Sequence, residues 1–252
     1  AHPLSSDPFP GWSPERKQRA IISAVQRDQD ELVSWIAPHV ETRARQDALP
    51  IAVVLDRRRC AQALLQPPLD PEAPTLRQAV LAAAHYGNAE ALRTLLGCGR
   101  FTPDTGRWAL RLAAERGHAD AARVLLEAGV TVELRQSDGR SLLIEAGARG
   151  HAGVFSLLLD EGERLSAHEL TEILDTVLFE AVSRIRLPTR HIYEGSDANK
   201  FYLARDLALT EIARKLIDAG ADPCSCRPES LARASERWMD GCVRLLWEAC
   251  KE

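Results

Sequence analysis

The sequence predicts an all-α solenoid of about seven stacked helix pairs, joined by short extended segments that we call fingers. The main observation is an internal repeat with a period of 33 residues: Gly106 recurs as Gly139, and Gly129 recurs as Gly162. Periods of roughly 20 to 50 residues are typical of stacked repeats. The second observation is composition, because leucine and alanine dominate and aromatic residues make up only 5% of the chain. This composition favours helices over strands.

Each repeat contains two predicted helices, and a glycine follows each helix. In the best-defined repeat, residues 108–116 carry leucine and alanine at helical spacing. Gly117 ends this helix, because glycine adopts a positive φ without a Cβ clash. Residues 119–127 form the second helix. The segment 130–138 lacks helical periodicity, so we predict an extended finger that closes in an Asp138–Gly139 turn.

A recurring pattern of glycine, leucine, alanine and histidine fills the two matching repeats. It runs Gly106-x-x-x-Leu110-x-x-Ala113-Ala114-x-x-Gly117-His118 and then Leu125-Leu126-x-x-Gly129, and it returns from Gly139 to Gly162. This pattern resembles the ankyrin repeat family, as does the sequence Gly220-Ala221-Asp222 after a later helix. The family's Thr-Pro-Leu-His tetrapeptide is replaced here by Trp108-Ala109-Leu110-Arg111. The resemblance implies an ankyrin-repeat solenoid with a concave face.

The repeats extend in both directions from this centre. We expect an N-terminal extension at residues 1–18 and a repeat domain at residues 19–252. The expected repeats span about 19–40, 47–68, 75–100, 104–133, 137–165, 168–223 and 227–252. The sixth contains an insertion, which we place at 185–203, before a second helix that begins near Ala204. Insertions in repeat arrays emerge on one face, which is often the face that binds.

Several function classes are disfavoured by the sequence. It has no glycine-rich phosphate loop, no Gly-x-Ser-x-Gly and no His-Glu-x-x-His, so we expect no enzyme activity, no cofactor and no metal site. The resemblance implies that His118 and His151 brace the turns that they follow. A formal net charge of −4 gives no reason to expect nucleic acid as a partner. No apolar run reaches the roughly 18–20 residues of a membrane span.

The resemblance also implies a set of partner-binding positions. In the family, the concave face is built from finger tips and from the two residues before the glycine that ends each first helix. Here those two-residue positions are Gln26–Arg27, Leu55–Asp56, His85–Tyr86, Glu115–Arg116, Ala148–Arg149, Ser183–Arg184 and Glu236–Arg237. The finger positions are Asp104, Arg107, Trp108, Ser137, Asp138 and Arg140.

Tyrosine, tryptophan and arginine are the commonest hot spots of protein interfaces, so they dominate our candidates. The candidate partner-binding residues are Tyr86, Arg107, Trp108, Arg111, Glu115, Arg116, Arg140, Arg149 and Arg184, with Arg190 and Tyr193 in the insertion. The alternative for each is an ordinary solvated residue, and Trp108 could instead pack between repeats. The run Arg57–Arg59 is either an exposed turn or a contact for an acidic partner or an anionic lipid.

These features together predict a protein-binding module without chemistry of its own, monomeric when alone. It would inhibit, scaffold or recruit another protein through its concave face and the insertion. Two alternatives remain open: a bacterial immunity or antitoxin protein that blocks a cognate effector enzyme, and the repeat part of a longer effector.

The location and the redox state of the cysteines depend on each other. The sequence begins at Ala1 and not at a methionine, so we expect that upstream residues were removed or left out. If these were a signal peptide, the protein would be periplasmic or secreted; otherwise it is cytoplasmic by default. We expect reduced thiols, with a disulfide in the C-terminal group as the alternative for an exported protein. That group contains Cys224, Cys226, Cys242 and Cys250.

Overall fold

The structure is a computed structural model that describes residues 9–65, 74–98, 102–132, 137–161, 164–184, 197–236 and 239–251. Among these residues the regular secondary structure is entirely helical. The chain divides into two compact units, Ala1–Val130 and Thr131–Glu252, which we call the N-terminal unit and the C-terminal unit.

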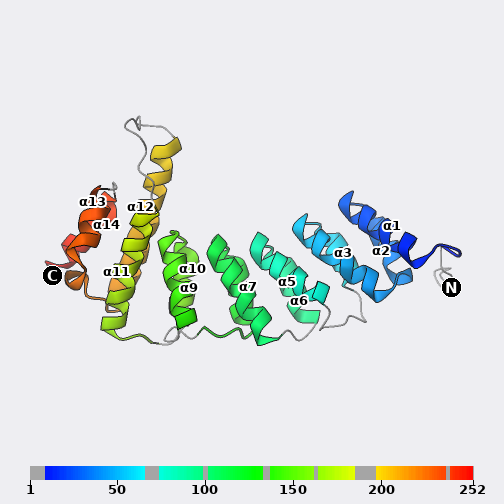
Figure 1. Cartoon of the computed structure of the whole chain (residues 1–252), viewed down its shortest axis with the longest axis horizontal. Helices are drawn as coiled ribbons and strands as arrows, with labels where there is room; N and C mark the ends of the chain where they lie inside the picture. The colour runs from blue at the N-terminus through cyan, green and yellow to red at the C-terminus, as the bar shows by residue number, and fades with distance from the viewer. Residues whose placement is uncertain are drawn as a thin grey trace. The chain divides into compact units, whose positions relative to one another are not determined.

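The N-terminal unit contains four helix pairs. They are α1 (Pro14–Gln26) with α2 (Asp30–Ile36), α3 (Thr42–Val54) with α4 (Arg58–Leu64), α5 (Pro74–Tyr86) with α6 (Ala89–Cys98), and α7 (Pro103–Arg116) with α8 (Ala119–Glu127). A short 3-10 helix, η1 (Ala37–His39), follows α2. The first helices form one layer, α1 against α3, α3 against α5 and α5 against α7 (Figure 1). The second helices α2, α4, α6 and α8 form the other layer in the same order.

The C-terminal unit repeats this arrangement with three helix pairs. They are α9 (Ser137–Ala148) with α10 (Ala152–Glu161), α11 (Ala167–Ser183) with α12 (Asp197–Asp218), and α13 (Pro228–Glu236) with α14 (Asp240–Ala249), and the 3-10 helix η2 (Pro223–Ser225) precedes α13. The first helix α11 packs between α9 and α13, and the second helix α12 packs between α10 and α14. The prediction of an all-α solenoid of about seven helix pairs is therefore confirmed.

Small buried residues let the first helices approach each other closely. Ala83 and Ala84 of α5 and Ala113 and Ala114 of α7 are fully buried. Leucines fill the space between the two layers, where burial of each apolar side chain contributes about 1.5–3 kcal/mol. Examples that are completely buried are Leu92, Leu95, Leu110, Leu125 and Leu158. The alanine–leucine pattern of the sequence thus encodes both layers of the fold.

The described helices begin earlier than the sequence predicts at three places. Thr102 accepts a hydrogen bond from the backbone N of Thr105 at 3.3 Å, so α7 begins at Pro103. Helix α9 begins at Ser137, which places Asp138–Gly139 inside a helix; the prediction of a turn at these two residues is wrong. Helix α12 begins at Asp197, so residues 197–203 are helical and are not part of a loop insertion.

An aromatic cluster covers the first helix pair. The ring centroid of Phe9 lies 4.4 Å from that of Trp12 and 5.1 Å from that of Trp35. The guanidinium of Arg16 lies 4.5 Å from the Trp12 ring centroid. Residues from Phe9 onward therefore contribute to the packing of α1 and α2, within a segment that the sequence suggests is an extension.

Two buried carboxylates hold the last helix pair. Asp175 of α11 accepts hydrogen bonds from the backbone N of Arg227 at 3.1 Å and from Ser230 Oγ at 2.8 Å, at the start of α13. Asp206 of α12 accepts from the backbone N atoms of Gly241 and Cys242 at 2.9 and 3.0 Å, at the start of α14. Asp206 thus satisfies two N–H groups in the first turn of α14 that have no partner within that helix. Asp175 instead bonds the residue directly before α13 and a side chain in its first turn, so both helices of the last pair are held at their N-terminal ends by the preceding pair.

Candidate binding surface

In the first five helix pairs, the turn between the two helices contains a residue with positive φ, which we call the turn residue. Gly87, Gly117 and Gly150 have this role, with φ of 71°, 77° and 77°. In the first two pairs the turn residues are Asp28 and Asp56, with φ of 58° and 53°. Aspartate is among the few residues other than glycine that occupy this left-handed region. With the turn residue as the common reference position, the sequences of the helix pairs can be aligned with one another.

This alignment corrects one predicted pair of surface residues. Asp56 is itself the turn residue, so the two residues before it are Val54 and Leu55 rather than Leu55 and Asp56. Both are large apolar side chains, yet they are 41% and 42% exposed. The prediction was displaced by one residue because Asp56 stands where the third, fourth and fifth pairs carry glycine.

The same alignment defines a longer surface on each first helix. Positions one, two, five, six and nine residues before the turn residue lie on one side of a helix with 3.6 residues per turn. We call this side the pre-turn stripe. In α7 it contains Trp108, Arg111, Leu112, Glu115 and Arg116. Five of the predicted candidates thus come from one stripe or its α5 equivalent, where Tyr86 stands directly before Gly87.

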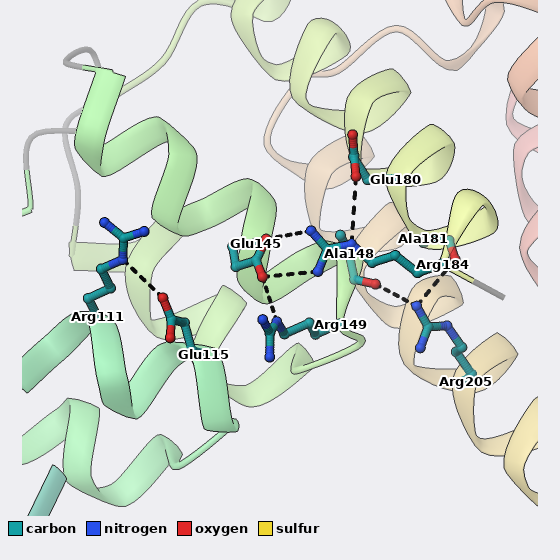
Figure 2. Close-up of polar contacts among 9 residues, drawn as sticks. All are labelled: Arg111, Glu115, Glu145, Ala148, Arg149, Glu180, Ala181, Arg184 and Arg205. Carbon is teal, nitrogen blue, oxygen red and sulfur yellow. Dashed lines mark hydrogen bonds and ion pairs between the residues drawn. The ribbon is translucent and has the colours of Figure 1, made fainter. Parts of the chain in front are cut away.

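Two aromatic side chains stand out on the stripe of the N-terminal unit. Tyr86 is 55% exposed and Trp108 is 59% exposed. The exposure of Trp108 argues against the alternative that it packs between repeats. Its ring lies 5.6 Å from the guanidinium carbon of Arg111, and Arg111 Nε donates to Glu115 Oε1 at 3.0 Å (Figure 2). Trp108, Arg111 and Glu115 therefore hold one another along one side of α7.

The other candidates in the N-terminal unit differ in their surroundings. Arg107 donates to Asp104 at 2.6 Å within the first turns of α7. Arg116 lies at the end of α7 and is exposed. Among the described residues, no ion pair with a carboxylate is formed by Arg116. Its guanidinium is available to a partner.

In the C-terminal unit the predicted arginines converge on one carboxylate, Glu145. Arg184 donates to both Glu145 oxygens, at 2.9 and 2.7 Å, and Arg149 Nε donates to Oε1 at 2.6 Å (Figure 2). Arg184 also lies 3.6 Å from Glu180. The hydrogen bonds from Arg184, followed by those from Arg149, lower the pKa of Glu145 to about 2. The candidates Arg149 and Arg184 are thus part of a compensated ion network between α9 and α11.

The remaining candidates are dispersed. Arg140, near the start of α9, donates to Glu172 of α11 at 2.6 Å, and this bond lowers the pKa of the Glu172 carboxyl. Arg190 and Tyr193 lie outside the described residues, as does the part of the insertion from 185 to 196. The side chains of Ser137 and Asp138 also lie outside the described part of the chain.

The run Arg57–Arg59 forms ion pairs within the N-terminal unit. Arg57 donates to Asp28 at 2.9 Å, and Arg59 donates to Asp30 at 3.3 Å, both in the preceding helix pair. Arg58 donates to Asp56 at 3.2 Å. These bonds support the interpretation of an exposed turn over that of a site for an acidic partner or a lipid, although each pair is exposed and contributes little alone.

In the second, third and fourth helix pairs, the residue directly after the turn residue joins that turn to the preceding one. Arg57 contacts Asp28, and Asn88 donates to Asp56 at 2.8 Å. In the next pair His118 Nε2 lies 3.0 Å from the carbonyl oxygen of His85. A Cβ on Gly87 would lie 2.5 Å from His118 Nδ1, so this turn admits only glycine without rearrangement. The implied bracing role of His118 therefore has a geometric basis in the N-terminal unit.

Among the described residues, no group of three or more histidine, cysteine, aspartate or glutamate side chains is arranged to hold a metal ion. None of the described helices combines the length and the apolar character needed to span a bilayer.

The comparison with known protein families agrees with the repeat pattern. The family model for ankyrin repeats (3 copies) matches residues 79–169. Among curated proteins, none matches this sequence. Among solved structures, the crystal structure of EF0377, an ankyrin repeat protein, is similar to this chain at 19% sequence identity, with a TM-score of 0.42. That match covers 91% of this chain and 96% of the other.

Proposed function

We propose that this chain binds another protein through the pre-turn stripe of its N-terminal unit, because the ankyrin-repeat model matches residues 79–169 and ankyrin repeats are in general protein-interaction modules. The observation that carries the proposal is the exposure of Leu55, Tyr86 and Trp108 at equivalent sides of α3, α5 and α7. Isolated exposed apolar residues are ordinary, but an apolar group on one surface is typical of a protein interface.

The residue types also support a binding role. Tyrosine and tryptophan bury a large area on binding while losing little side-chain entropy, and truncating such a hot spot costs about 2 kcal/mol or more. Arg116 stands at the Tyr86-equivalent position of α7 and can pair with a carboxylate of the partner. Binding through this surface needs no catalytic group, so in this proposal the chain acts as a binding module and not as an enzyme.

The C-terminal unit contributes less direct binding energy in this proposal. Arg149 and Arg184 are already bonded to Glu145, so a partner would have to replace those bonds rather than add new ones. Phe179 of α11 is 39% exposed, and the guanidinium of Arg233 lies 4.9 Å from its ring centroid. The bonded state of Arg149 and Arg184 favours a primary contact on the N-terminal unit.

The proposal is tested with wild-type protein and the double variant Y86A/W108A as baits in an extract of the cells that produce the protein. A protein captured by wild type is identified by mass spectrometry, purified and titrated by calorimetry. We expect Y86A/W108A to bind it at least about tenfold more weakly. The matched control is Trp247→Ala, which removes an exposed tryptophan from α14 in the C-terminal unit. Equal binding by wild type and Y86A/W108A would contradict the proposed surface.

The captured protein also separates the finer roles. If it is an enzyme that loses activity on binding, the role is inhibition, which includes immunity against a cognate effector. If its activity persists and a third component is bound as well, the role is scaffolding or recruitment.

A further inference from the structure

The charge and polarity of the pre-turn stripe identify the kind of segment that fits it. We propose that the partner of the N-terminal unit presents a short segment that combines large apolar side chains with aspartate or glutamate. This inference rests on the proposed function. The argument uses the five stripe positions of α1, α3, α5 and α7, aligned by the turn residues Asp28, Asp56, Gly87 and Gly117.

Many of the stripe positions are apolar, and they lie on all four helices. Val54, Leu55, Tyr86 and Trp108 are exposed at these positions. Further apolar side chains at the stripe positions between them are half-buried. These are Ile22, Pro50, Ile51, Leu81, Ala82 and Leu112. A partner that covers this surface needs apolar side chains of its own to bury against it, because burial of apolar area is the main favourable term in association.

The edges of the surface are basic. The stripe positions contain the arginines Arg19 and Arg27 of α1 and Arg111 and Arg116 of α7. Their acidic counterparts are Asp47 and Glu115. Glu115 already accepts from Arg111 at 3.0 Å, and Asp47 accepts from Gln18 at 2.9 Å. The surface therefore carries an excess of positive charge on a chain whose formal net charge is −4.

Two of these arginines are positioned for a carboxylate from outside. Arg27 and Arg116 occupy the same position, directly before the turn residue, at opposite ends of the layer α1–α3–α5–α7. Both are exposed, and neither forms an ion pair among the described residues. Leu55 and Tyr86 occupy this position on the two helices between them. A segment lying along the row would meet arginine, leucine, tyrosine and arginine in turn.

Carboxylate is the ligand that this arrangement favours. Guanidinium groups bind carboxylates through two parallel hydrogen bonds, and at the edge of an apolar surface the bond is partly shielded from water. A basic segment would meet four arginines and would be repelled, so the same groups exclude wrong partners. Single-stranded RNA also combines negative charge with stacking on aromatic rings, but the net acidity of the chain opposes it.

In the experiment, binders to the intact wild-type protein are selected from a displayed library of random peptides of about 15 residues. This length is enough to cross the four helices of the layer, which are spaced by about 10 Å. We expect the selected peptides to be enriched in leucine, phenylalanine and tryptophan together with aspartate and glutamate. The best peptide is then synthesised, and its Kd is measured at low and high salt. We expect its affinity to fall as the salt concentration rises, because carboxylate–arginine contacts at the edge are screened.

Three double variants separate the charge from the apolar surface. R27E/R116E should weaken binding of the peptide by at least about tenfold, because each arginine becomes a repulsive carboxylate. Y86A/W108A should weaken it to a similar degree. The control R123E/R214E makes the same change in net charge at exposed arginines of the second helices α8 and α12, and it should leave the Kd unchanged.

The outcomes distinguish this inference from the proposed function. Neutral or basic selected peptides that lose affinity only for Y86A/W108A would overturn the acidic partner while leaving the binding surface intact. A peptide that binds Y86A/W108A as tightly as wild type would overturn the surface itself. If the library gives no binder, a short peptide segment is not the partner. If a random RNA pool binds the wild-type protein and binds R27E/R116E more weakly, the partner is nucleic acid and not a peptide.

Discussion

Nη2 of Arg205 donates a hydrogen bond to the carbonyl oxygen of Ala148 at 2.7 Å, and the same nitrogen lies 3.2 Å from the carbonyl oxygen of Ala181 (Figure 2). Ala148 stands two residues before the turn residue Gly150, just as His85 stands two residues before Gly87. Arg205 of α12 therefore contacts the turn of the preceding pair at the position that His118 contacts in the N-terminal unit. A longer side chain makes this contact in the pair that contains the insertion.

We expect Arg205→Met to destabilise the C-terminal unit by about 1–3 kcal/mol, because it removes the donor from two carbonyl groups while keeping an apolar stem of similar length. Burial, followed by repulsion from Arg184, lowers the pKa of Arg205, and the two hydrogen bonds offset part of the cost of placing its charge here. The measurement is urea unfolding of the whole chain. Arg214→Met on the exposed side of α12 is the control, and an equal effect of the two changes would contradict this role.

The carboxyl of Glu145 links stability to pH. Its pKa in the folded protein is about 2, against an ordinary value of 4.5, because Arg184 and Arg149 stabilise its charged form. A folded-state pKa that is lowered contributes stability above the unfolded pKa, and this contribution is lost as the pH falls toward 2.

We therefore expect Glu145→Gln to lower the free energy of unfolding by about 1–2 kcal/mol at pH 7, after allowance for solvent screening. The difference between wild type and variant should shrink as the pH falls from about 4.5 toward 2, where the wild-type carboxyl becomes protonated. Thermal unfolding at a series of pH values measures this. Glu211→Gln, at an exposed position of α12, should show no comparable dependence, and a constant difference for Glu145→Gln would contradict the ion network.

Substitutions at Asp56 can separate two contributions to stability: the strain of a positive φ in the backbone and the hydrogen bonds of the side chain. The φ of Asp56 is 53°, and its carboxylate accepts from Asn88 at 2.8 Å and from Arg58 at 3.2 Å. We expect Asp56→Ala to cost about 1–2 kcal/mol, because alanine is strained at positive φ and accepts neither bond. Asp56→Gly should cost about 1 kcal/mol less than Asp56→Ala, since glycine adopts this φ freely. Chemical denaturation of both variants tests the difference, and equal midpoints would exclude backbone strain at Asp56.

Features that depend on local contacts could be predicted from the sequence, and features that depend on contacts between distant residues could not. The helix pairs could be predicted because Gly117, Gly150 and the leucines after them recur at a fixed spacing. The predicted pair Gln26–Arg27 does precede the turn residue Asp28, whereas Asp56 was assigned to a surface pair and its role as the turn residue was missed. The signal that could have found it is the ability of aspartate to adopt positive φ, together with the apolar helix that precedes it.

The candidate surface was predictable only in part for a related reason. Tyr86, Trp108 and Arg116 follow from the position of the turn glycines, but the bonds between Glu145, Arg149 and Arg184 join helices that are far apart in sequence. No periodicity indicates that Arg149 and Arg184 share a carboxylate. Arg205 could not be found from the repeat either, because the insertion shifts it out of the spacing that places His118.

The cysteines of the C-terminal unit differ in their expected reactivity. Cys226 and Cys242 are buried, and burial raises the pKa of each to about 12. Cys224 and Cys250 are exposed, and Cys224 Sγ lies 3.7 Å from the carbonyl oxygen of Cys250. A hydrogen bond between their side chains is the main cause that raises the pKa of Cys250 to about 11. All four are free thiols, so the structure represents the reduced form.

We expect a maleimide at neutral pH to label Cys224 and Cys250 in the folded protein, and Cys226 and Cys242 only after unfolding, because a thiol reacts as its thiolate and must be accessible. Cys224→Ala should accelerate labelling of Cys250, since loss of the hydrogen bond lowers its pKa toward 9.0 and raises its thiolate fraction. Peptide mapping by mass spectrometry at several times gives the rate for each site. If Cys250 is labelled at the same rate in wild type and in Cys224→Ala, the thiol pair does not control its reactivity.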